Sequence, residues 1–260
     1  MSPLLFDSHC HLNHDAFGAD LPEVIGRARD AGVGRLLVPG FDLESSIKAI
    51  ALARNDDSIS AAAAVHPYSA AELDSDVKSR LVEIWASGAA VAVGEIGLDF
   101  AGRGYPEPEV QSEAFAWQLD QAERLGLPVI IHQRRSAAAI LEQLAGRRIA
   151  GVMHCWSLGP EDLDRFLDLG LYVSFAGLLT FKSAEPVRAA ATLVPDGRLL
   201  VETDAPYLVP RGARPGRRNE PANLPLTVDL LARLRHSAGD EVAALCAENA
   251  RALFDLPDAA

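Results

Sequence analysis

The chain has 260 residues, of which 24 are Lys or Arg and 36 are Asp or Glu, so its formal net charge is −12. A chain this acidic is unsuited to wrapping duplex DNA or an anionic membrane over its whole surface. Cys10, Cys155 and Cys246 cannot all pair within the chain and none lies in a CxxC motif, which excludes a disulfide scaffold and a zinc ribbon. The first residues carry no leader pattern and no later stretch is long enough to span a bilayer, so we expect a cytoplasmic protein without a membrane partner.

Short apolar runs typical of strands alternate with longer amphipathic stretches typical of helices along the whole chain. We expect strands that begin at Leu4, Arg35, Ser58, Ala89, Pro128, Ile149, Leu171 and Leu199. Helices are expected over residues 21–31, 43–54, 76–87, 109–125 and 161–169. Eight strand–helix units in this length predict an α/β fold, a single (β/α)8 TIM-type barrel that spans residues 1–260 as one domain. An open doubly wound sheet is disfavoured because no GxGxxG or GxxxxGK[ST] motif occurs.

The first strand carries three polar side chains at alternate positions, Asp7, His9 and His11, in the segment FDSHCHL. Alternate residues of a strand point to one face, so all three would share the barrel mouth while Cys10 points away. In such a barrel the carboxyl ends of the strands converge on the active site. The segment therefore predicts part of an active site at the end of the first strand.

Four further candidates lie at the ends of later strands: Glu95 after the fourth, His132 after the fifth, His154 after the sixth and Asp204 after the eighth. A single histidine at the end of an apolar run is more often a hydrogen-bonded structural residue than a metal ligand. Here, however, four of the seven histidines fall at the ends of strands one, five and six. Imidazole and carboxylate groups brought together in this way favour a divalent transition metal.

Six ligands exceed what one catalytic ion uses while it keeps an open position, so we expect two divalent ions, Mg²⁺, Mn²⁺ or Zn²⁺. His9, His11 and Asp204 would hold one ion, and His132 and His154 the other. Glu95 is the expected bridging carboxylate and Asp204 the expected acceptor of a proton from a metal-activated water, which makes these two the catalytic residues. Asp7 is expected to orient a ligand histidine.

The residues also carry a resemblance to a known family. The chain resembles the TatD family of metal-dependent hydrolases through an ordered series of segments that covers nearly its whole length: FDSHCHL, AVHP, GEIGLDF, PVIIHQR, MHCWS, GLLTFK, LLVETDAPYL, RRNEP and ENARALF. The resemblance implies a metal-dependent deoxyribonuclease that acts mainly as a 3′ to 5′ exonuclease on single strands. It places the family's metal positions on the same six residues, His9, His11, Glu95, His132, His154 and Asp204.

The substrate is predicted less directly. Basic residues follow strands five, seven and eight: Arg134, Lys182, Arg211, Arg214, Arg217 and Arg218. Together they form either a rim that binds phosphate or ordinary solvated loops. We name His66, Arg134 and Lys182 as candidate substrate contacts, and His66 could equally be structural. Phe100, Trp156, Phe181 and Tyr207 either stack on bases or pack at the barrel top.

The expected substrate is therefore single-stranded DNA or another phosphodiester or ester. A small-molecule amidohydrolase or lactonase, and a D-aminoacyl-tRNA deacylase, would use the same metal site, and a metal-free binding module is the remaining alternative. Exonuclease and endonuclease action, the native metal and the oligomeric state are not decided by the sequence.

Overall fold

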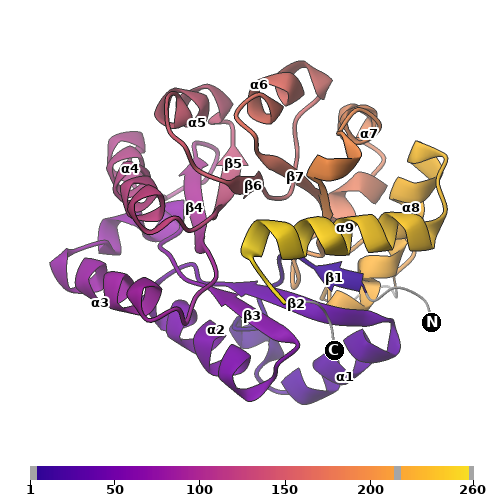
Figure 1. Cartoon of the computed structure of the whole chain (residues 1–260), viewed down its shortest axis with the longest axis horizontal. Coiled ribbons are helices and arrows are strands. Elements are labelled where there is room, and N and C mark those ends of the chain that lie inside the picture. Colours follow the sequence, from indigo (N-terminus) through magenta and orange to yellow (C-terminus); the bar gives the residue numbers. More distant parts are fainter. Residues whose placement is uncertain (1–4, 214–217, 258–260) are drawn as a thin grey trace. The chain divides into compact units, whose positions relative to one another are not determined.

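A computed structural model of the chain describes residues 5–213 and 218–257. The chain divides into two compact units. Figure 1 labels their helices and strands and colours them along the sequence. We call Met1–Val38, Cys155–Asp164 and Tyr172–Ala260 the first unit, and Pro39–His154 with Arg165–Leu171 the second unit. The single domain predicted over residues 1–260 stays a prediction.

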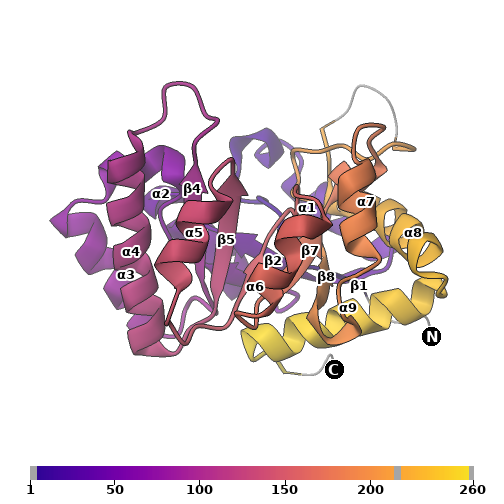
Figure 2. The same ribbon diagram turned by 90° about the horizontal axis from the view of Figure 1, so that it is seen from above.

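The second unit contains four strands and the helices that connect them. Its elements are α2 (Leu43–Asn55), β3 (Ile59–Ala62), α3 (Ser75–Ala86), β4 (Val93–Asp99), α4 (Pro108–Leu125), β5 (Val129–Arg134), α5 (Ala137–Leu144), β6 (Gly151–Met153) and most of α6 (Leu163–Leu167). Strands β4, β5 and β6 are parallel neighbours, and Ala63, just beyond β3, forms a parallel bridge with Val93. Helices α4 and α5 run alongside β4 and β5 (Figure 2). Apolar side chains such as Ile96, Leu98 and Ile130 fill the core.

The first unit also consists of parallel strands and connecting helices, and its strands come from both ends of the chain. Its elements are β1 (Leu5–Asp7), α1 (Leu21–Asp30), β2 (Val33–Pro39, of which Pro39 falls in the second unit), β7 (Tyr172–Phe175), α7 (Glu185–Ala191), β8 (Leu199–Val201), α8 (Leu224–Arg235) and α9 (Gly239–Phe254). Strand β1 is parallel to β2, and β7 is parallel to β8. The backbone N–H of Ser8 donates to Val201 O, which joins the end of β1 to β8.

All eight predicted strands are present, and each begins within four residues of its expected start. The largest difference is β4, which begins at Val93 rather than Ala89, because Ala89 and Ala90 follow the end of α3 as a connection. The predicted helix over residues 161–169 is shorter, since its first turn is a 3₁₀ helix at Pro160–Asp162. None of the helices within residues 5–213 and 218–257 has both the length and the apolar character that crossing a bilayer requires.

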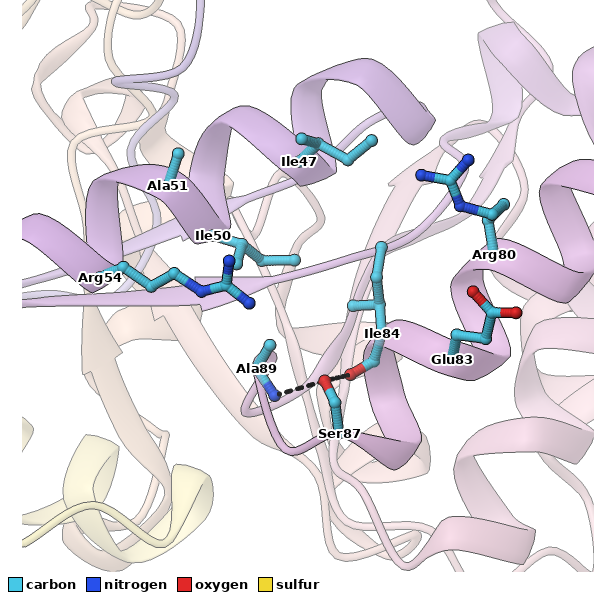
Figure 3. A pocket seen from close by; sticks show the side chains of 9 residues that line it. All are labelled: Ile47, Ile50, Ala51, Arg54, Arg80, Glu83, Ile84, Ser87 and Ala89. Atoms are coloured by element: carbon cyan, nitrogen blue, oxygen red, sulfur yellow. Dashed lines mark hydrogen bonds between the residues drawn. The ribbon is translucent and has the colours of Figure 1, made fainter.

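One surface hollow lies between α2 and α3 in the second unit, with a volume of about 280 Å³ (Figure 3). Its floor is apolar, formed by Ile47, Ile50 and Ile84, with Arg54 and Arg80 at its margin. None of the predicted site residues lines it.

Candidate metal centre

In the second unit a buried carboxylate lies among three imidazoles. Glu95 Oε1 is 2.8 Å from His154 Nε2, 2.9 Å from His132 Nδ1 and 3.5 Å from His66 Nε2. His132 Nδ1 and His154 Nε2 are themselves 3.4 Å apart. We call these four residues the Glu95 cluster. Ring nitrogens and carboxylate oxygens that converge in this way are the ligand set that divalent transition metals use.

The positions of these side chains follow from strand geometry. Glu95, Gly97 and Asp99 are alternate residues of β4 and share one face of the strand. Gly97 pairs in register with His132 of β5, so the imidazole lies beside β4 between the two carboxylates. His154 directly follows β6, where its backbone N–H still donates to Ile131 O at 3.1 Å.

Gly97 is required at this position for two reasons. Its φ of 140° is a conformation that residues with a side chain rarely adopt. A Cβ atom there would also lie 2.0 Å from the backbone oxygen of His132. The close approach of β4 to β5, and with it the position of the His132 backbone, therefore depends on glycine.

His132 is held at both ring nitrogens. Nδ1 faces Glu95 Oε1, and Nε2 is 3.2 Å from Asp99 Oδ2. Burial disfavours the protonated imidazole, but the hydrogen bonds to Asp99 and Glu95 outweigh it and raise the pKa of His132. Burial likewise disfavours the charged form of Asp99, yet the hydrogen bonds from His132 and from the Ala101 N–H keep the pKa of this carboxyl below its ordinary value.

The first unit holds a second group of donors. His9 Nε2 and His11 Nε2 are 3.1 Å apart and lie 3.8 and 3.5 Å from Asp204 Oδ1. We call these three residues the Asp204 cluster. Backbone hydrogen bonds fix them to one another, because Asp204 N–H donates to His9 O at 2.9 Å and His11 N–H donates to Ala205 O at 2.7 Å. Asp204 adopts a φ of 54°, a left-handed conformation that aspartate tolerates better than most residues.

His9 and His11 were expected within the first strand, but β1 ends at Asp7 and both histidines lie in the segment that follows it. Asp7 was expected to orient a ligand histidine, and it contacts the backbone of His9 rather than an imidazole ring. Its carboxylate accepts hydrogen bonds from the backbone N–H groups of His9 and Thr203, at 3.3 and 2.9 Å, and from the Thr203 hydroxyl. Burial raises the pKa of Asp7 to about 8, although the hydrogen bonds from Thr203 lower it. Asp7 thus joins two backbone segments that carry the Asp204 cluster.

Arg218 and Asn219, in the connection after β8, also contact segments of the first unit near the Asp204 cluster. Asn219 is fully buried and its side-chain amide donates to Thr203 O at 2.9 Å. The Arg218 guanidinium forms an ion pair with Asp20 and stacks on the ring of Phe17, with 4.6 Å between the guanidinium carbon and the ring centroid. The contacts with Asp20 and Phe17 engage the Arg218 guanidinium, and its place in a phosphate-binding rim stays a prediction.

The other predicted substrate contacts fall into three groups. Lys182 and Arg211 are exposed, and Arg211 N–H donates to Thr180 Oγ1 at 2.8 Å, which links the loops after β7 and β8. Arg134 is 60% exposed with its Nη1 atom 3.9 Å from Asp99 Oδ2. Arg214 and Arg217 lie outside the described residues.

Among the candidate stacking residues, Phe100 and Tyr207 are exposed, whereas Trp156 is buried and packs in the core. Phe181 is partly exposed.

Asp99, Gln111 and Tyr68 were not named as site residues from the sequence. The signal for Asp99 was present, since it lies four residues after Glu95 in GEIGLDF and alternate strand residues share a face. Tyr68 is 39% exposed and its ring centroid is 4.5 Å from that of His66, with the rings of Phe41 and Tyr105 each 6.0 Å from Tyr68. Tyr68 lies in a short 3₁₀ helix, Pro67–Glu72, which has no periodic sequence signal.

Both clusters have the chemistry that a divalent ion requires. Each contains imidazole nitrogens and a carboxylate oxygen within a few ångströms of one another, in largely buried surroundings. His66, Glu95 and His132 offer one ligand atom each from a set of atoms that all lie within 4.8 Å of one another. The six predicted ligands therefore divide between the units as three donors in the first and three in the second, with His66 beside the latter.

A model of the family described as TatD related DNase matches residues 6–255. A relative from Edwardsiella piscicida, named 3′-5′ ssDNA/RNA exonuclease TatD, is 38% identical over 260 residues and covers 97% of this chain and 100% of its own length. The uncharacterized metal-dependent hydrolase YabD of Bacillus subtilis is 35% identical over 254 residues, covering 96% and 99%.

Among solved structures, the YjjV TatD homologue of Escherichia coli K12 matches with a TM-score of 0.92 at 32% identity, over 99% of this chain and 100% of that one. A TatD family hydrolase from Entamoeba histolytica matches with a TM-score of 0.85 at 21% identity, which bears on the fold alone. These matches confirm the predicted α/β barrel class and the predicted enzyme class. The chain belongs to the TatD family of metal-dependent hydrolases.

Proposed function

We propose that this enzyme hydrolyses phosphodiester bonds of single-stranded DNA from the 3′ end, using two divalent ions. The observation that carries hydrolysis is the Glu95 cluster, in which one buried carboxylate oxygen lies within 3.5 Å of three imidazole nitrogens. The choice of substrate is supported by the relative that is 38% identical and is named an ssDNA/RNA exonuclease. Single-stranded RNA is therefore a second substrate to test.

Two sets of residues would hold the ions. His9, His11 and Asp204 form one set, and Glu95, His132 and His154 the other, with Mg²⁺, Mn²⁺ and Zn²⁺ as candidate ions. When bound, such ions supply Lewis acidity and activate water for attack on phosphorus. The bridging role predicted for Glu95 from the sequence stays a prediction.

The Nδ1 atom of His66 accepts a hydrogen bond from the backbone, which determines where its ring proton lies. The backbone N–H of Tyr68 donates to His66 Nδ1 at 3.2 Å, so a neutral His66 carries its proton on Nε2. That Nε2–H group points towards the Glu95 cluster, 3.5 Å from Glu95 Oε1. A hydrogen-bond donor there suits the oxygen of a phosphate better than it suits a metal ion, which supports the predicted role of His66 as a substrate contact.

Asp204 keeps its predicted role as the acceptor of a proton from the attacking water. Its side chain is 13% exposed, so it is the most accessible residue of the Asp204 cluster. Lys182 and Arg134 remain candidate phosphate contacts because both side chains are exposed cations in an acidic chain. Tyr68 adds an exposed aromatic face beside His66, on which a base could stack.

The test begins with protein stripped by a chelator and reloaded with Mg²⁺, Mn²⁺ or Zn²⁺. We expect a 5′-labelled single-stranded oligonucleotide to shorten stepwise, and a 3′-terminal phosphorothioate to block this shortening. Glu95→Gln should abolish the ladder, whereas Glu83→Gln, an exposed glutamate on α3, should leave it unchanged. Rapid cleavage of lactones, small esters or D-aminoacyl-tRNA, with no oligonucleotide cleavage under any ion, would overturn the proposal in favour of those substrates.

A further inference from the structure

We propose that Asp99 is a positioning residue that fixes the tautomer and orientation of His132, so that Nδ1 rather than Nε2 is the ligand atom. The inference concerns Asp99 and its support by Gln111, and it rests on the proposed function only in taking the Glu95 cluster as a metal site. Its first observation is that His132 Nε2 lies 3.2 Å from Asp99 Oδ2 while Nδ1 lies 2.9 Å from Glu95 Oε1.

An ionised carboxylate can only accept hydrogen bonds, so each ring nitrogen of His132 carries a proton while it faces Asp99 or Glu95. A metal ion held by the cluster would replace the proton on Nδ1, which leaves a neutral ring that is protonated at Nε2 and has its lone pair on Nδ1. This nitrogen faces Glu95 and is 3.4 Å from His154 Nε2, the other candidate donor atom. The lone pair therefore points towards the centre of the cluster. Carboxylate groups that hold a ligand histidine in this way raise its basicity and typically change metal affinity 10- to 100-fold when lost.

Asp99 is itself rigidly held. Its other oxygen, Oδ1, accepts hydrogen bonds from the backbone N–H groups of Ala101 and Gly102, both at 2.9 Å. Gln111 on α4 clamps the backbone of Asp99, accepting from its N–H at 2.9 Å and donating to its carbonyl oxygen at 3.1 Å. Asp99 and Gln111 are each 2% exposed. A carboxylate with one oxygen occupied by its own loop and the other aimed at a ring has one orientation available.

The variant that tests this is Asp99→Asn, which keeps the shape of the side chain and removes its charge. The matched control is Asp74→Asn, because Asp74 Oδ1 also accepts two backbone N–H groups at 2.9 Å, from Asp76 and Val77. Asp74 is exposed at the start of α3, so this control removes the charge of a carboxylate that accepts two backbone N–H groups but lies outside the Glu95 cluster.

Zn²⁺ affinity is measured on the full chain by competition with a chelator. We expect Asp99→Asn to weaken the affinity for one of the two Zn²⁺ ions about 10- to 100-fold. Asp74→Asn should leave the affinity for both ions unchanged. Zinc affinity of Asp99→Asn equal to that of the wild type, in a variant whose melting temperature matches that of Asp74→Asn, would overturn the proposal.

A second measurement uses the wild-type protein and does not depend on how a variant folds. Histidine-selective ¹⁵N NMR of the zinc-loaded enzyme should show His132 protonated at Nε2 and bound to zinc through Nδ1. The opposite assignment would refute the positioning role. Neither measurement requires turnover, so a protein that binds zinc as expected but leaves DNA intact would refute the proposed function and leave this inference standing.

Discussion

Replacing Gly97 with alanine should damage the Glu95 cluster through the backbone alone. The added Cβ would lie 2.0 Å from His132 O, whereas ordinary contact begins at 3.4 Å, so β4 and β5 must separate by more than 1 Å at this pair. Overpacking of this kind costs about 1–3 kcal/mol, and the positive φ adds roughly 1–2 kcal/mol. A displacement of about 1 Å in a catalytic group can lower turnover about 100-fold.

The control for this prediction is Gly126→Ala at the end of α4. Gly126 also has a positive φ, 67°, but a Cβ atom there meets nothing within 4 Å. The control therefore carries the cost of a left-handed backbone without the clash. Gly97→Ala should be less stable than Gly126→Ala by at least the overpacking term of about 1–3 kcal/mol, which corresponds to roughly 2–12 °C in melting temperature.

Thermal melts and metal content of both variants provide the assay. Gly97→Ala should melt below Gly126→Ala and retain less metal, while Gly126→Ala should retain wild-type metal content. Equal melting temperatures for the two variants, or full metal content and turnover in Gly97→Ala, would refute the reasoning that the β4–β5 approach positions His132.

Three further predictions concern substrate binding, the RRNEP segment and alkaline stability. Tyr68→Ala should raise KM for an oligonucleotide by about 5- to 150-fold, the effect of one lost stacking contact, and leave KM for a nitrophenyl phosphodiester unchanged. Tyr68→Phe should behave as wild type, and equal KM values in the two variants would exclude a stacking role. Arg218→Ala and Asp20→Asn should each lower the melting temperature, and the double variant should lower it by less than the sum of the two single effects. The salt dependence of DNA cleavage should not change, and a flatter salt dependence in Arg218→Ala would instead show that Arg218 binds phosphate. Burial raises the pKa of Cys246 to about 12, whereas an unfolded thiol titrates near 8.5, so the folded state binds the proton more tightly. The free energy of unfolding should therefore fall as pH rises above about 8.5, by up to about 1.4 kcal/mol per pH unit. Urea melts of Cys246→Ala across pH 8–11 should show a smaller fall, and an identical fall would contradict this assignment.

The sequence predicted the elements and the six ligand candidates because both depend on local pattern. Alternation of apolar and amphipathic runs marked the eight strands, and polar residues at strand ends marked Glu95, His132 and His154. The start of β4 was misplaced because Ala89 and Ala90 are apolar like a strand but belong to the connection after α3.

Other features depend on contacts between distant segments, which a single sequence does not reveal. Arg218 was expected either in a phosphate-binding rim or in a solvated loop, because nothing local indicates its ion pair with Asp20, 198 positions away. Asp7 was expected to orient a ligand histidine, and it accepts a hydrogen bond from the backbone N–H of His9. Its contacts with the backbone N–H and hydroxyl of Thr203, 196 positions away, had no signal in the sequence. The pairing of Asp99 with His132 needed the register of β4 against β5.

The central claim is that each of the two clusters holds one divalent ion and that hydrolysis needs both. The most direct measurement is elemental analysis of Zn²⁺-loaded wild type, of Asp204→Asn in the first unit and of His154→Ala in the second, together with cleavage of single-stranded DNA. We expect two ions per chain in the wild type, about one in each variant, and strongly reduced cleavage in both variants. A fully active wild type that binds fewer than two ions, or a variant that loses an ion and cleaves DNA at the wild-type rate, would contradict the claim.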